Sequence, residues 1–164
     1  MKEGIFKALE LANYLNYKYY DQYRNNISPL KLQKVLFFLF AEWGGFVKKN
    51  DIQSHTDGSW IAEKFSPYLF SEEIQAWVYG PVVKDVYDNF KNGKNDGSKL
   101  FDTDDKIYIK GFIDDLSSDL FKLSDFRLVE LSHQTKCWID NFESSEPFHN
   151  NPIDKDTIIN EFAL

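Results

Sequence analysis

The residue pair best suited to covalent chemistry is His133 and Cys137. On a single helix their spacing of four would place the imidazole and the thiol on one face, with Glu130 one turn earlier. That arrangement would suit a thiolate nucleophile with an imidazole base. However, the surrounding sequence supplies no oxyanion hole, and cysteine is more often a small buried hydrophobic residue. We therefore expect Cys137 to be structural and the protein to have no enzymatic activity.

Metal and nucleotide sites have little support. The chain has three histidines, His55, His133 and His149. They lack the spacing of metal-binding motifs, and a single cysteine cannot form a CxxC pair. Neighbouring carboxylates such as Asp104 and Asp105 would point about 100° apart on a helix and would not converge. Gly44-Gly45 is not followed by the Lys-Ser/Thr of a phosphate-binding loop. We expect no metal and no cofactor.

Composition favours a protein partner. A chain of 164 residues fits one domain, and aromatic residues, which dominate interface hot spots, make up 17% of it. The net charge of -7 argues against direct binding to nucleic acid. This charge is uneven, because residues 1–50 carry eight Lys/Arg against four Asp/Glu, whereas 51–164 carry eleven against twenty-two. An acidic face for a basic partner and a merely solvated acidic surface both fit this pattern.

The sequence also indicates a compartment. A single cysteine fits a reducing cytosol. The longest apolar run, Val35 to Ala41, is too short to span a bilayer, and the N-terminus lacks the features of a secretory signal. We expect a soluble, cytoplasmic protein without membrane contact.

Apolar periodicity predicts a mainly α fold, a compact helical domain with one small antiparallel strand pair. A first amphipathic helix includes Ile5 to Tyr19 and ends near residues 24–26. Ser28-Pro29 should start a central buried helix over Leu30–Trp43, which Gly44-Gly45 should stop. Three further helices are expected over residues 107–123, 125–131 and 156–162, with Thr103 or Asp104, Ser124 or Asp125, and Asp154 as caps.

Trp77 and Tyr79 stand where a two-residue alternation changes to a helical one. Ile74 to Val78 alternates as a strand does, and Pro81 suits the first turn of a following helix. A tryptophan beside a Gly-Pro turn is more often a core anchor than a recognition surface. Lys31 and Lys34 fall on the polar stripe of the central helix and could provide a basic patch next to this turn.

Four segments together resemble the Panacea domain of SocA-like and phage-associated antitoxins. They are ISPLKLQKVLFFLFAEW (27–43), EIQAWVYGPVVKDVYDNF (73–90), LVELSHQTKCW (128–138) and NPIDKDTIINEF (151–162). The matches follow the family's order and cover nearly the whole chain, so residues 1–164 are interpreted as a single Panacea-like domain. His133 matches a histidine of the family pattern. Residues 46–71 are longer than this stretch in the family, and we interpret them as an insertion.

The resemblance implies an antitoxin that neutralises a cognate protein toxin by direct binding. In this family some members instead act as adaptors that deliver the toxin to a cytosolic protease. We expect the turn formed by Trp77, Tyr79, Gly80 and Pro81 to form or support the toxin-binding face. Lys31, Lys34 and the family-matching His133 are the remaining predicted members of this face.

Two other readings stay open. The chain could be a phage or mobile-element protein that inhibits a nucleic-acid-binding host defence protein, since acidity and aromatic content fit that function equally well. It could also be a scaffolding domain without a toxin. The neighbouring gene would discriminate between these classes, because a small toxic reading frame supports an antitoxin and a cluster of anti-defence genes supports an inhibitor.

Overall fold

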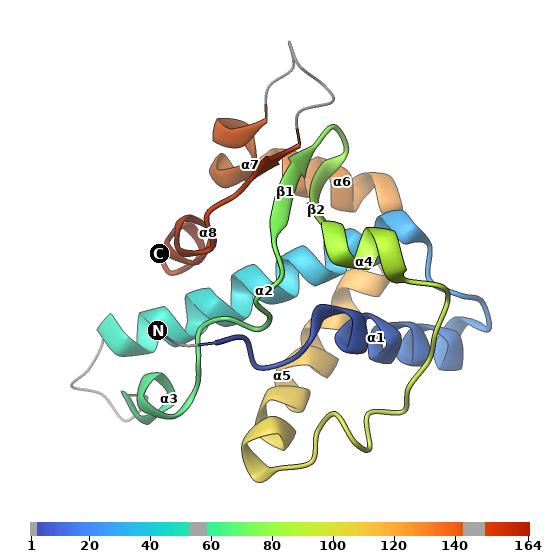
Figure 1. Cartoon of the computed structure of the whole chain (residues 1–164), viewed down its shortest axis with the longest axis horizontal. Helices are drawn as coiled ribbons and strands as arrows, with labels where there is room; N and C mark the ends of the chain where they lie inside the picture. Colours follow the sequence, from blue (N-terminus) through green and yellow to red (C-terminus); the bar gives the residue numbers. More distant parts are fainter. Residues whose placement is uncertain (1–2, 53–58, 143–149) are drawn as a thin grey trace.

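The computed structural model describes residues 3–52, 59–142 and 150–164. Within these residues the chain forms eight helices and one three-stranded sheet (Figure 1). The helices are α1 (Ala8–Tyr23), α2 (Pro29–Ile52), α3 (Ser59–Lys64), α4 (Lys84–Asn89), α5 (Asp104–Phe121), α6 (Asp125–His133), α7 (Lys136–Asn141) and α8 (Lys155–Phe162). The strands are β1 (Ile74–Trp77), β2 (Gly80–Val83) and β3 (Asn151–Pro152). The predicted mainly helical fold is confirmed, although the sheet has a third strand.

Helix α2 is the centre of the fold. It begins at Pro29 as predicted, and Ser28 Oγ accepts a hydrogen bond from the Lys31 N–H at 3.0 Å. Residues 31–41 are all buried, which explains why apolar side chains occupy nearly its whole circumference. α2 crosses the middle of the molecule, with α1 and α5 on one side and the hairpin of β1 and β2 on the other (Figure 1).

The prediction that Gly44-Gly45 would stop the central helix is wrong, because α2 continues to Ile52. A Cβ atom on Gly44 would lie 2.9 Å from Cδ1 of Ile159, and one on Gly45 would lie 2.5 Å from the carbonyl oxygen of Phe162. Both contacts belong to α8. The two glycines therefore allow α8 to pack closely on α2, and that packing offsets their helix penalty of about 1 kcal/mol each.

The predicted capping residues at the starts of three helices are confirmed. Thr103, Ser124 and Asp154 each accept a hydrogen bond from the N–H three residues later, at the starts of α5, α6 and α8. By contrast, α1 begins only at Ala8, because Phe6 is extended and its N–H donates to the carbonyl of Leu69 at 3.0 Å.

The strand-to-helix change falls later than predicted. Pro81 lies in β2, paired with Ala76, and the helix begins at Lys84. The strand order is β2-β1-β3, so β2 is an edge strand, where a residue without an N–H is tolerated. Val78 and Tyr79 form the hairpin turn, and Gly80 supplies its positive φ of 109°.

Residues 46–71 pack partly into the core. Val47 extends the buried face of α2, and Ile61, Phe65 and Phe70 are buried beyond it. Residues 53–58 of this stretch lie outside the described residues, and its status as an insertion stays a prediction. Within the described ranges, no helix combines the length and apolar character needed to cross a membrane.

Candidate functional site

The hairpin of β1 and β2 is held by side chains from three helices. Four of its backbone carbonyls accept hydrogen bonds from side chains. Near the turn, Trp138 Nε1 donates to the Trp77 carbonyl at 2.8 Å and His133 Nε2 donates to the Val78 carbonyl at 3.0 Å. Along β2, Lys34 Nζ donates to the Pro81 carbonyl at 2.8 Å and Gln33 Nε2 donates to the Val83 carbonyl at 3.3 Å. The donors come from α2, α6 and α7. Because a carbonyl can only accept, His133 carries its proton on Nε2 in this arrangement. The hairpin is therefore fixed along both strands and at its turn.

Lys34 lies inside the protein rather than on a polar stripe, so that part of the prediction is wrong. Its side chain is fully buried, and its ammonium group donates to the Pro81 carbonyl from 47 positions earlier in the chain. Burial lowers the pKa of Lys34 to about 7, because the charged form loses its hydration. The lysine therefore supports the hairpin from beneath and adds no charge to the surface.

Lys31 is also buried, with 7% of its surface exposed, and it serves a different element. Its Nζ donates to the carbonyls of Phe121 and Leu123 at 2.8 and 2.7 Å, and lies 3.8 Å from the Asp125 carboxylate. These carbonyls end α5, where backbone acceptors lack helical partners and the helix dipole is negative. The predicted basic patch formed by Lys31 and Lys34 is therefore not present.

Gly80 is required by the packing beneath the hairpin as well as by its φ. A Cβ atom here would collide with Ser132 Oγ and would lie 2.9 Å from Cε of Lys34. Ser132 is itself buried and donates to the Val129 carbonyl at 2.7 Å. The turn, α2 and α6 thus meet at a point with no room for a side chain.

Above this point the hairpin presents an exposed aromatic and aliphatic surface. Val78 and Tyr79 at the turn are 51% and 58% exposed, Tyr87 of α4 is 60% exposed and Ile139 of α7 is 53% exposed. Trp77 and Trp138, both half-buried, are neighbours of these residues in the chain and are hydrogen-bonded to each other. We call these six residues the hairpin patch: Trp77, Val78, Tyr79, Tyr87, Trp138 and Ile139.

One ring contact and one hydrogen bond join three residues of the hairpin patch, because Trp138 Nε1 donates to the Trp77 carbonyl and the Trp77 ring meets that of Tyr87. The rings of Trp77 and Tyr87 are 4.7 Å apart and meet edge to face, and Trp138 stacks on His133 at 4.2 Å. Trp77 is thus partly a packing residue and partly exposed, between the two alternatives that its sequence position suggested. Contiguous exposed apolar surface on a rigid scaffold commonly marks a protein-binding site.

The His133–Cys137 pair does not form a catalytic dyad. α6 ends at His133 and α7 begins at Lys136, so the two residues do not share a helix. The thiol is fully buried, and burial raises its pKa to about 12, so a thiolate is not available at neutral pH. The Glu161 carboxylate accepts hydrogen bonds from the N–H groups of Lys136 and Cys137 and therefore caps the start of α7.

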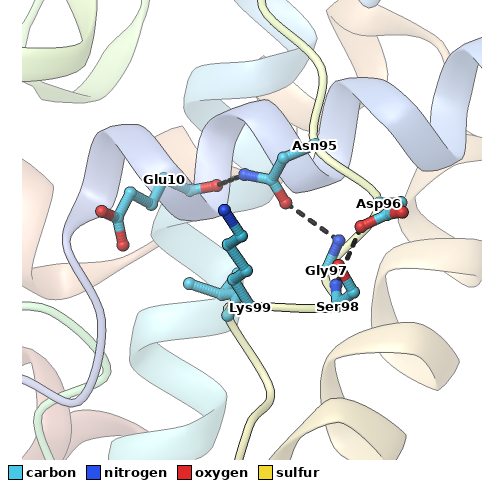
Figure 2. A pocket seen from close by; sticks show the side chains of 7 residues that line it. Glu10, Asn95, Asp96, Gly97, Ser98 and Lys99 are labelled. Atoms are coloured by element: carbon cyan, nitrogen blue, oxygen red, sulfur yellow. Dashed lines mark hydrogen bonds between the residues drawn. The ribbon is translucent and has the colours of Figure 1, made fainter.

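Two further features bear on other kinds of site: the arrangement of metal-ligating side chains and a shallow surface pocket. Among the described residues, no group of three or more His, Cys, Asp or Glu could hold a metal ion; His55 and His149 lie outside them. A shallow pocket lies between Glu10 and the loop at residues 95–100 (Figure 2). There the side chains of Asn95 and Asp96 accept from the N–H groups of Gly97 and Ser98, so the polar groups stabilise the loop itself (Figure 2).

The hairpin and α6, which holds its turn through His133, fall within a known family pattern. The family model described as "Antitoxin SocA-like, Panacea domain" matches residues 56–139, just over half of the chain. The chain belongs to this family. The match contains β1, β2, α4, α5 and α6, and all of the hairpin patch. The two other resembling segments, 27–43 and 151–162, fall outside it. No curated protein and no solved structure matches the chain.

Sequence reasoning missed several members of this candidate site in the Panacea domain. Gln33 could have been found, because a glutamine beside Lys34 interrupts an otherwise apolar stretch and must find partners when buried. Tyr87, Trp138 and Ile139 gave no such signal, since each lies in an ordinary amphipathic pattern. Of the predicted residues, Trp77, Tyr79, Gly80, Pro81, Lys34 and His133 come together, and Lys31 contacts the end of α5 instead.

Proposed function

We propose that this Panacea-domain protein is an antitoxin that neutralises a cognate protein toxin by binding it directly through the hairpin patch. Membership of an antitoxin family implies a protein partner in general. The observation that carries the assignment to this face is the exposure of Val78, Tyr79 and Tyr87 on a hairpin clamped at four carbonyls. Large aromatic side chains held at the centre of such a surface are typical binding hot spots.

Rigidity of the hairpin supports the proposal energetically. Binding normally costs the ordering of loops and side chains at the interface. Trp138 and His133 already hold the carbonyls of Trp77 and Val78, two successive residues that lead into the turn, so the turn enters the complex with little left to order. His133 therefore supports the face, and its donated hydrogen bond persists whether the ring is neutral or protonated.

We propose stoichiometric action, by occupation of the toxin rather than by chemistry on it. The raised pKa of the Cys137 thiol and its burial favour this reading. Delivery of the toxin to a protease is a variant of the same proposal, in which binding is followed by degradation. The two are separated by whether the toxin persists in cells after neutralisation.

Co-expression with the product of the adjoining reading frame tests the proposal. We expect native protein to restore growth, and Tyr79→Ala to lose this protection while keeping its thermal midpoint. Tyr17→Ala on α1 is the matched control, because this tyrosine is also exposed and α1 lies across α2 from the hairpin (Figure 1). Full protection by Tyr79→Ala would place the binding face elsewhere, and the absence of any toxicity or binding in the pair would contradict the antitoxin assignment.

A further inference from the structure

The sheet is closed to partners that would add a strand. On β2, Gln33 of α2 both accepts from the Val83 N–H at 2.8 Å and donates to the Val83 carbonyl, as a neighbouring strand would. Lys34 takes the Pro81 carbonyl on the same edge. The other edge strand, β3, is two residues long and contains Pro152, which has no N–H to offer. A partner must therefore engage side chains rather than the backbone ladder.

The side chains available for this are those at the hairpin tip. Val78 and Tyr79 project from a turn whose flanking carbonyls are already bonded, and more than half of each side chain is exposed. A convex, rigid pair of this kind fits a concave apolar pocket better than a flat surface.

Charge along the hairpin points to the chemistry of the rim of the toxin's binding surface. Lys84 of α4 is paired with Asp88 of the same helix, and Lys136 of α7 is paired with Asp140. Two carboxylates are not matched in this way. Glu73 precedes β1 and accepts from the amide of Gln75, and Asp85 of α4 accepts from the amide of Asn89. In the described part of the chain neither forms an ion pair. Both lie where Ile74 pairs with Val83, at the end of the hairpin opposite its tip, so this end of the hairpin carries uncompensated negative charge.

We infer that the toxin receives Val78 and Tyr79 in an apolar pocket, and that the rim of the toxin's binding surface carries lysine or arginine opposite Glu73 and Asp85, at the other end of the hairpin. This inference rests on the proposed function and specifies the binding chemistry of the same face. The tip provides affinity through burial, and the two carboxylates steer association and set register, as rim charges do.

Binding kinetics test the inference with the purified product of the adjoining reading frame as the probe. The double variant Glu73→Gln/Asp85→Asn removes both charges, while each new amide oxygen can still accept the hydrogen bond that its carboxylate accepts. We expect an association rate constant lower by roughly 3- to 10-fold at low salt, with a flatter salt dependence. Asp115→Asn is the matched control, because Asp115 is exposed and α5 lies across α2 from the hairpin (Figure 1). This variant should bind as the native chain does.

Tyr79→Ala reports on the pocket independently. As a hot-spot truncation it should raise the dissociation rate constant by roughly 30-fold or more, with little change in association. Native association and salt dependence in the double variant would overturn the basic rim, and native dissociation in Tyr79→Ala would overturn the pocket. If the native chain itself fails to bind the probe, the proposed function fails first, and the inference fails with it.

Discussion

Replacement of the buried Lys34 by methionine should change how the stability of the protein depends on pH. Lys34 has a pKa of about 7 in the folded chain, against 10.5 for an unperturbed lysine. Between these values the unfolded chain binds more protons than the native chain, so the free energy of unfolding rises with pH. The stabilising, neutral form of this buried lysine is fully available only above pH 7.

The size of the effect follows from the two pKa values. The limiting slope for one proton is about 1.4 kcal/mol per pH unit, and integration from pH 7 to pH 9 gives roughly 2 kcal/mol of added stability. Above pH 9 the Cys137 thiol acts in the opposite sense, because its raised pKa makes the unfolded chain lose a proton first. The thiol contributes little between pH 7 and pH 9, and what it contributes cancels when the native chain is compared with a Lys34 variant.

Urea unfolding followed by circular dichroism at pH 7, 8 and 9 measures this slope. Lys34→Met keeps an unbranched apolar stem but leaves the Pro81 carbonyl without its donor, at a cost of about 1–3 kcal/mol that is independent of pH. The native curve should therefore rise by roughly 2 kcal/mol relative to the Lys34→Met curve between pH 7 and pH 9. Lys99→Met, at an exposed position, should keep the native slope. Parallel curves for the native chain and Lys34→Met would refute the assignment of a buried, neutralising lysine.

Three further predictions concern the packing around the site. Gly45→Ala should destabilise the protein by about 1–3 kcal/mol in urea unfolding, because the methyl group meets the backbone of Phe162. Gly111→Ala should stabilise it by about 0.5–1 kcal/mol, since nothing lies within 4 Å of that position. The opposite order of stabilities would contradict the close packing of α8 on α2. Glu161→Ala should lower stability by about 1–2 kcal/mol through loss of the α7 cap, seen as a lower thermal midpoint. The Cys137 thiol should resist a chromogenic disulfide reagent in the native chain and react fully in urea; rapid labelling without denaturant would show that the segment opens.

The helix starts were predictable because they depend on atoms within one turn of the chain. Ser28, Thr103, Ser124 and Asp154 each accept a hydrogen bond from an N–H three residues later, so their side chains and local backbone suffice. The burial of α2 on nearly its whole circumference was equally predictable, because the apolar residues themselves cause it. The candidate turn at Trp77–Pro81 was found for a related reason, as the alternation on either side of it is local.

Only the tertiary structure decided what the exceptional residues do. Gly44-Gly45 reads as a helix stop by local propensity, yet α8, more than a hundred residues later, packs on both glycines and keeps the helix intact. Lys34 has the local pattern of a surface lysine, yet it is buried and donates to the carbonyl of Pro81, whose own strand position depends on β1. In each case the deciding partner is remote in the chain, and the free energy of that contact exceeds the local preference. The sequence therefore indicated where the candidate site lies, and the remote contacts determined which of its side chains are exposed and which hold the hairpin in place.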